Sequence, residues 1–267
     1  GPSQDARGGC SPDMRQAKRC PTSCLAIVLL LGASPSQASE VCLPSPYEAE
    51  MGEVSVLAKR LTDSLVPFPS LAEALVEQAP TLCLDDTLYE ELGYYEPKTN
   101  RIVLRAGVDQ DFQLAILVHE IRHLEQYGRD ICPTPAMAVS DYIRSRLALE
   151  ADAAAIAVYV AWKLREAGAP GPWESLQGWQ THMDLVARFA TEIDLGGDEV
   201  AATAATYAQW FEGRERLDIY GFAICSNYLD ALDRDNLLPG KQTLPDDYAA
   251  RLCVLPDGRP YDCIVPP

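Results

Sequence analysis

Three residues in the middle of the chain have the types and the spacing of a metal site. His119 and His123 are four positions apart, and Glu120 follows the first of them in the pattern His-Glu-x-x-His. On a helix, residues four apart lie one above the other, so both imidazoles can point at one metal ion. The carboxylate of Glu120 lies beside them, where it can take a proton from a water that the metal activates. The pattern therefore predicts a metal site with its own general base.

A histidine on an apolar helix face is more often a hydrogen-bonded core residue than a metal ligand. This chain has only three histidines, and two of them fall in the pattern with the glutamate in place. From these residue frequencies, a chance match is expected in roughly a few chains per thousand. The metal site is therefore favoured over a purely structural role.

The element that positions the histidines is predicted to be a helix over residues 109–128. Apolar residues recur there at three- and four-residue spacing: Leu114, Leu117, Val118, Ile121 and Leu124. Phe112 and Ile116 continue the histidine face, so the helix is apolar on two sides and predicted to be buried. Asp109 can cap its start, and Gly128 can end it.

A second long helix is predicted over residues 134–168, with a break near Ser140. Its alanine-rich middle carries two acids, Glu150 and Asp152, in an otherwise apolar stretch. Burying an unpaired carboxylate is costly, and a metal or a metal-bound histidine would offset that cost. The alternative is that both acids face water.

The remaining chain predicts further helices and a small sheet. Helices are expected at 45–65, 70–78, 172–195, 198–213 and 214–233. A strand is expected at 81–84, and the segments 94–95 and 101–105 can pair as a hairpin. The fold class is therefore α+β, predominantly α.

Residues 1–38 are predicted to be a leader with a secretory signal peptide. Three basic residues follow Met14, an apolar run covers 25–31, and small residues end at Ala38. The run is too short to span a membrane, so we expect cleavage near Ala38. The alternative is a disordered leader. Residues 39–267 are then expected to form a single domain, exported to the periplasm or secreted.

The charge of the chain bears on its partners. The net charge is −17, and the predicted leader holds four of the 22 basic and two of the 39 acidic residues. The remainder then has 18 basic and 37 acidic residues, a net charge of −19. So acidic a surface argues against nucleic acid or a membrane surface as partner.

The cysteines agree with an oxidising compartment. Six follow the predicted leader: Cys42, Cys83, Cys132, Cys225, Cys253 and Cys263. An even number fits up to three disulfides. Cys253 and Cys263 flank a turn-rich segment and are the favoured pair, whereas the pairing of the other four stays open. No Cys-x-x-Cys spacing occurs, so no cysteine is expected to bind zinc.

The two central helices resemble the gluzincin group of zinc metallopeptidases. The stretches His-Glu-x-Arg-His-x-x-Gln at 119–126 and Glu-Ala-Asp-Ala at 150–153 are also similar to an uncharacterised bacterial family of metallopeptidases. The resemblance covers roughly residues 101–165. It implies a zincin-like fold, with a small sheet packed on the active-site helix, and zinc as the cofactor.

The resemblance also implies a set of ligands. In gluzincins a glutamate on the second helix is the third ligand, and it corresponds to Glu150, 27 residues after His123. Many members carry an aspartate four residues later, which orients a ligand histidine, but here that position is Ala154. Asp152 is the nearby acid. It is left either with that orienting role or as an alternative third ligand beside His119 and His123.

The expected chemistry is hydrolysis of a peptide or protein substrate. Zinc activates a water, and Glu120 accepts its proton and later returns it to the leaving amine. A further donor usually stabilises the oxyanion. His182 is the preferred candidate, followed by Tyr207 and Tyr220, although each could instead be an ordinary surface or half-buried residue. The strand at 101–105 is expected beside the metal, with one edge open for the substrate.

Three functions remain open at this point. The first is an exported zinc-dependent metallopeptidase, and the intact Glu120 favours it because a purely structural site has no use for that residue. The second is a non-catalytic exported binding or scaffold protein with a structural or degenerate metal site. The third, an intracellular regulatory protease, is disfavoured by the leader and the cysteines.

Overall fold

The computed structural model describes residues 40–48, 51–89 and 91–267, so the predicted leader lies outside the described residues. The described part is α+β and mostly helical, as predicted. Its strands are β1 (Glu40–Leu43), β2 (Thr81–Asp85), β3 (Gly93–Glu96) and β4 (Arg101–Arg105). Its helices are α1 (Glu53–Leu65), α2 (Pro69–Gln78), α3 (Gln110–Gly128), α4 (Val139–Glu166), α5 (Gly171–Gln177), α6 (Met183–Asp194), α7 (Glu199–Trp210), α8 (Arg214–Arg234) and α9 (Tyr248–Leu252).

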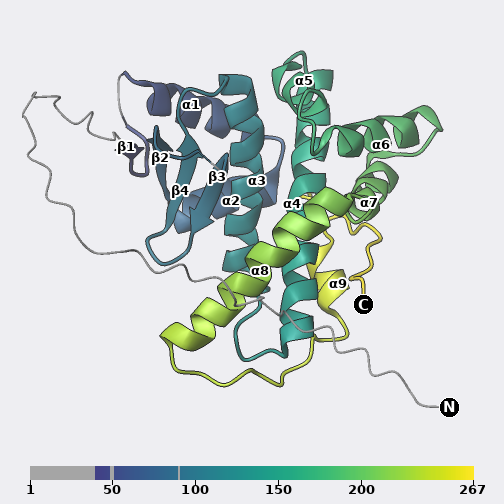
Figure 1. The fold of residues 1–267 in the computed structure, drawn as a ribbon. Helices are drawn as coiled ribbons and strands as arrows, with labels where there is room; N and C mark the ends of the chain where they lie inside the picture. The colour runs from purple at the N-terminus through teal and green to yellow at the C-terminus, as the bar shows by residue number, and fades with distance from the viewer. Residues whose placement is uncertain (1–39, 49–50, 90) are drawn as a thin grey trace, which may run out of the picture. The chain divides into compact units, whose positions relative to one another are not determined.

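The four strands form one mixed sheet in the order β1-β2-β4-β3 (Figure 1). The predicted hairpin is confirmed, because β3 runs antiparallel to β4 with Glu96 opposite Arg101. β2 and β4 are parallel, and β1 is antiparallel to β2. β1 was not predicted from the sequence, since it is only four residues long and its sequence, Glu-Val-Cys-Leu, shows no alternation of polar and apolar residues.

The prediction that residues 101–105 have one open edge is wrong. β4 lies inside the sheet, paired with β2 on one side and with β3 on the other. Its residues Ile102, Val103 and Leu104 are all buried, as is typical of an interior strand that is covered on both faces. The strands at the two edges of the sheet are β1 and β3.

Helix α3 begins and ends as predicted. The carboxylate of Asp109 accepts hydrogen bonds from the backbone N–H groups of Asp111 and Phe112 at 2.9 and 3.3 Å. Figure 1 shows α3 with the sheet on one side and α4 on the other. The approach of β3 is close, since a Cβ added to Gly93 would lie 3.0 Å from the side chain of Ile116.

Helix α4 is central to the helical part, and the residues from Ala148 to Ala161 are all buried. Its alanines let α3 and α7 pack closely against it. The helix begins at Val139, later than predicted, because residues 134–138 form a turn in which the N–H of Met137 donates to the C=O of Thr134.

Two other helix predictions had wrong boundaries. The first helix begins at Glu53 instead of residue 45, because the chain turns at Tyr47, whose φ is +64°. The helix expected at 172–195 is two helices, α5 and α6, joined by residues 178–182. α5 ends with Gly178 as its C-cap, and in the connection that follows the rings of Trp179 and His182 stack on each other.

The cysteine pair Cys253–Cys263 is bonded as predicted, and a second disulfide joins Cys42 to Cys83, which lie opposite each other in β1 and β2. These four cysteines therefore cannot supply thiolates to a metal. Both bonds are compatible with an exported protein.

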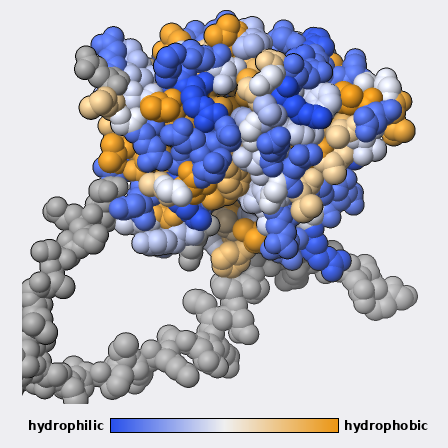
Figure 2. All heavy atoms as spheres, turned by 90° about the horizontal axis from the view of Figure 1, so that it is seen from above, coloured by the Kyte–Doolittle hydropathy of each residue, from blue (hydrophilic) through white to orange (hydrophobic). Residues whose placement is uncertain are grey.

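The surface seen in Figure 2 is mostly hydrophilic, with small groups of apolar residues between the polar ones. Among the described residues, no helix has the length and apolar character that crossing a bilayer requires.

Candidate metal centre

The three predicted ligands converge. The Nε2 atoms of His119 and His123, both on α3, are 3.0 Å apart. One carboxylate oxygen of Glu150, on α4, lies 3.2 Å from Nε2 of His123 and 3.4 Å from Nε2 of His119. The three side chains keep between 11% and 16% of their surface exposed, so the group is close to solvent without being on the open surface.

These separations fit zinc. With zinc–ligand bonds of about 2.0–2.1 Å and tetrahedral angles, neighbouring ligand atoms lie about 3.3 Å apart. The three donor atoms of this group are 3.0, 3.2 and 3.4 Å apart, before any ion draws them together. Two histidines and one glutamate are also a known ligand set for catalytic zinc. The residues present can therefore hold this ion.

The charges inside the group are strongly coupled. Burial opposes a charge on His123, but the nearby Glu150 outweighs it and raises the pKa of His123 to about 9. Burial also acts against the charge of Glu150, yet His123 and His119 hold its pKa well below the usual range. Glu150 is therefore a carboxylate, and its negative charge favours a positive charge at this position, such as that of a divalent cation.

Glu120 is buried beside the group but does not belong to it. Its carboxylate is not among the atoms that lie within 4.8 Å of one another in the cluster of His119, His123 and Glu150. Burial raises the pKa of Glu120, and the two histidines and a main-chain hydrogen bond from Tyr95 oppose this rise. A buried carboxylate beside the candidate ligands, with a raised pKa, suits a general base.

Asp152 is not a third ligand. It is fully buried and accepts two hydrogen bonds from the guanidinium of Arg122, at 2.7 and 3.0 Å. It also accepts one from the amide of Gln126 at 2.7 Å and one from the hydroxyl of Tyr261 at 2.5 Å. The positive charge of Arg122 therefore offsets the cost of burying the Asp152 carboxylate. Asp152 can influence the orientation of the His123 ring only through Gln126, which lies between them.

Gln126 lies in the sequence motif at 119–126, but no role in the site was predicted for it from the sequence alone. Its side-chain oxygen lies 2.8 Å from Nδ1 of His123. It follows His123 by three positions, which places the two on the same helix face. A polar residue at this spacing from a ligand histidine is the signal that points to it.

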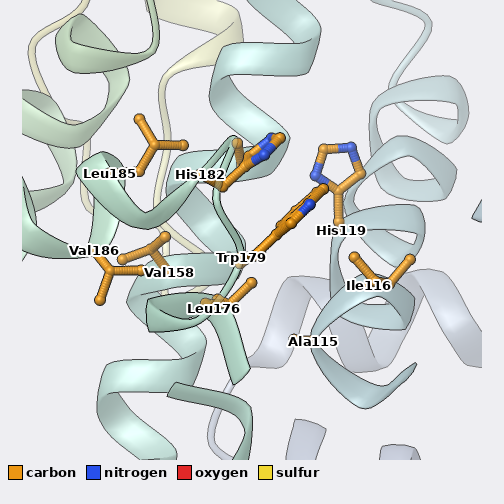
Figure 3. Close-up of a pocket in the computed structure, with 11 residues that line it drawn as sticks. Ala115, Ile116, His119, Val158, Leu176, Trp179, His182, Leu185 and Val186 are labelled. Atoms are coloured by element: carbon orange, nitrogen blue, oxygen red, sulfur yellow. The ribbon is translucent and has the colours of Figure 1, made fainter. Parts of the chain in front are cut away.

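His182 lies in the connection between α5 and α6, facing the metal group. Figure 3 shows His182 and Trp179 directed towards His119 of α3. The rings of His182 and Trp179 are stacked at 3.6 Å, and Nδ1 of His182 lies 2.8 Å from the hydroxyl of Thr181. Its Nε2 is buried and has no hydrogen-bond partner among the residues that the structure describes. Burial and the neighbouring His119 lower the pKa of His182 to about 3, so the ring is neutral.

A small apolar cavity adjoins these rings. Ala115 and Ile116 of α3 and Val158 of α4 line it together with His119 and His182 (Figure 3). Its volume of about 10 Å³ leaves room for about one water molecule. In this conformation the cavity is therefore too small for a large side chain.

The two candidate tyrosines differ in their position relative to the ligands. Tyr207 is buried away from the ligands, and its hydroxyl donates to the C=O of Ile264 at 3.2 Å, so it is not a site residue. Tyr220, on α8, is half-buried, and burial together with the charges of Glu150 and Glu120 raises its pKa, which indicates that these two carboxylates lie near it. Tyr220 therefore stays a candidate beside His182.

Comparison with known proteins agrees with this geometry. A family model described as "Putative metallopeptidase family (DUF6782)" matches residues 35–263. No curated protein and no solved structure matches the chain.

Proposed function

Because this chain belongs to the putative metallopeptidase family (DUF6782), we propose that it is an exported zinc-dependent peptidase that cleaves peptide bonds with an activated water. The observation that carries the proposal is the convergence of His119, His123 and Glu150, with the buried Glu120 beside them. The disulfides support export.

A zinc ion bound to these three residues would lower the pKa of a water molecule and polarise the scissile carbonyl. Glu120 is proposed to accept the proton of that water. Because its carboxylate is buried, it can hold the proton and return it to the leaving amine. Structural zinc sites are usually closed by four protein ligands, whereas only three converge among the described residues of this group. This disfavours the scaffold alternative.

His182 is proposed to stabilise the oxyanion. Its ring is neutral, so one nitrogen carries a proton. If the hydroxyl of Thr181 donates to Nδ1, then Nε2 carries that proton and is a buried donor with no acceptor in the described part of the chain. An unused donor facing the ligands is what a developing negative charge on the substrate requires.

The substrate is proposed to lie along β3. The N–H of Arg105 donates to the C=O of Leu92, so the alternation of an antiparallel ladder turns the main-chain groups of Tyr95 away from β4. The main-chain hydrogen bond of Tyr95 to Glu120 agrees with this direction. The outer edge of β3 therefore runs past the proposed base, where an extended peptide could add to it.

The role of His182 can be tested by replacing it with phenylalanine, which keeps a ring on Trp179 but has no N–H. We expect kcat to fall about 100- to 1,000-fold while zinc affinity stays unchanged, because one oxyanion donor is lost. Steady-state peptide hydrolysis measures kcat, and zinc titration measures the zinc affinity. Tyr220→Phe is the comparison variant. A large loss for Tyr220→Phe and none for His182→Phe would move the role to Tyr220.

A further inference from the structure

The orientation of the Gln126 side chain is fixed by its surroundings. Gln126 is fully buried, and its amide nitrogen donates to the C=O of Leu149 at 3.1 Å and to Asp152 at 2.7 Å. Since both of these partners are acceptors, the amide nitrogen must face them. The side-chain oxygen must then face Nδ1 of His123, 2.8 Å away.

This orientation determines which nitrogen of His123 carries the proton. An amide oxygen can only accept, so Nδ1 of His123 must be the protonated nitrogen. In the neutral ring, Nε2 then keeps its lone pair and points at His119 and Glu150. Metal-ligating histidines commonly have their other N–H held in this way by an acceptor.

The acid behind Gln126 is held by the C-terminal segment. Tyr261 lies between Cys253 and Cys263, which are disulfide-bonded, and its hydroxyl donates to Asp152 at 2.5 Å. Arg122 of α3 binds Asp152 with two hydrogen bonds. The same guanidinium donates to the C=O groups of Leu252 and Val254 at 3.1 and 2.9 Å, which ties this segment to the ligand helix.

We propose that Gln126 is a positioning residue that fixes the tautomer and the ring orientation of His123, and that the C-terminal segment 252–263 holds Gln126 through Tyr261 and Asp152. The inference rests on the proposed metal site. It makes the last part of the chain, 130 residues away from the ligand helix in sequence, a part of the metal centre.

Gln126→Met tests the first half of the proposal, because methionine fills a similar volume without the amide. Gln113→Met is a matched control, since Gln113 is buried on the same helix and donates to the C=O of Arg105 at 3.0 Å without touching a ligand. Zinc affinity is measured on metal-free protein by competition with a chromophoric chelator, and thermal unfolding of each metal-free variant is followed in parallel.

Gln126→Met is expected to weaken zinc binding about 10- to 100-fold, as for other outer partners of metal ligands. Gln113→Met should lower the unfolding temperature without changing zinc affinity. Equal zinc affinities for wild type and Gln126→Met would overturn the inference while leaving the proposed function intact. A wild-type protein that binds no zinc would overturn both.

Tyr261→Phe tests the second half, because it removes only the hydroxyl that reaches Asp152. It should weaken zinc binding more than the Gln113→Met control does, and an effect no larger than that control would remove the C-terminal segment from the proposal. A measurement on wild type needs no variant. In the zinc-loaded protein, nitrogen-15 NMR should show a proton on Nδ1 of His123. A proton on Nε2 instead would contradict the proposed role of Gln126.

Discussion

Glu120→Gln should retain zinc and slow peptide hydrolysis by about 100- to 10,000-fold. The carboxylate is buried beside the ligands without being one of them, so its amide analogue fits the same space and leaves His119, His123 and Glu150 in place. An amide cannot accept a proton from water at neutral pH, so the attacking nucleophile would form inefficiently. The measurements are zinc stoichiometry and turnover of a peptide substrate.

Glu125→Gln is the matched control for this variant. Glu125 is a buried glutamate on the same helix, but it pairs with Arg122 at 2.6 Å instead of facing the ligands. Losing that charge should lower stability and leave zinc binding and turnover close to wild type. Turnover by Glu120→Gln at the wild-type rate would rule out Glu120 as the general base.

Replacing either ligand histidine by alanine should release zinc and abolish hydrolysis together. His119 and His123 each supply one of three donor atoms, and two remaining donors cannot form the coordination shell of a catalytic zinc. The loss of zinc affinity should exceed the 10- to 100-fold that is typical of outer partners. Competition with a chelator measures it, and circular dichroism checks that the helices persist.

The third histidine of the chain offers the control for this pair. His182 faces the site without belonging to the ligand group, so His182→Ala should keep zinc while it loses activity. Retention of full zinc affinity by His123→Ala, or loss of zinc by His182→Ala, would show that the ligands are assigned wrongly.

The helix that carries the candidate ligands could be predicted because its signal is local. The four-residue spacing of His119 and His123 and the apolar periodicity of 109–128 lie within one element, where helix geometry relates sequence to space directly. The position of Glu150 could not be predicted from helix spacing, since it depends on how α3 and α4 pack. The resemblance to gluzincins predicted that it lies beside the histidines, and in the structure its carboxylate is 3.2 Å from Nε2 of His123.

The surroundings of the ligands could not be predicted, because they come from contacts that leave no period in the sequence. Tyr261 reaches Asp152 across 109 positions, and nothing near either residue indicates the other. The open edge was misassigned for a related reason. A strand's neighbours depend on sheet order, although three consecutive apolar residues in β4 already favoured an interior position.

The stacked pair Trp179 and His182 shows a third kind of limit. The apolar spacing over 172–195 was compatible with one continuous helix, but α5 ends at Gln177 with Gly178 as its C-cap, and α6 begins only at Met183. The connection between them, with its stacked rings, is not described by apolar spacing alone.

The most direct test of a zinc-dependent peptidase is the metal content of the purified protein, measured together with hydrolysis of a broad peptide library before and after chelation. We expect about one zinc ion per chain, loss of hydrolysis when the chelator removes it, and recovery when zinc is returned. A protein that holds zinc firmly but cleaves no peptide in the library would contradict the proposed peptidase activity and favour a non-catalytic binding or scaffold protein.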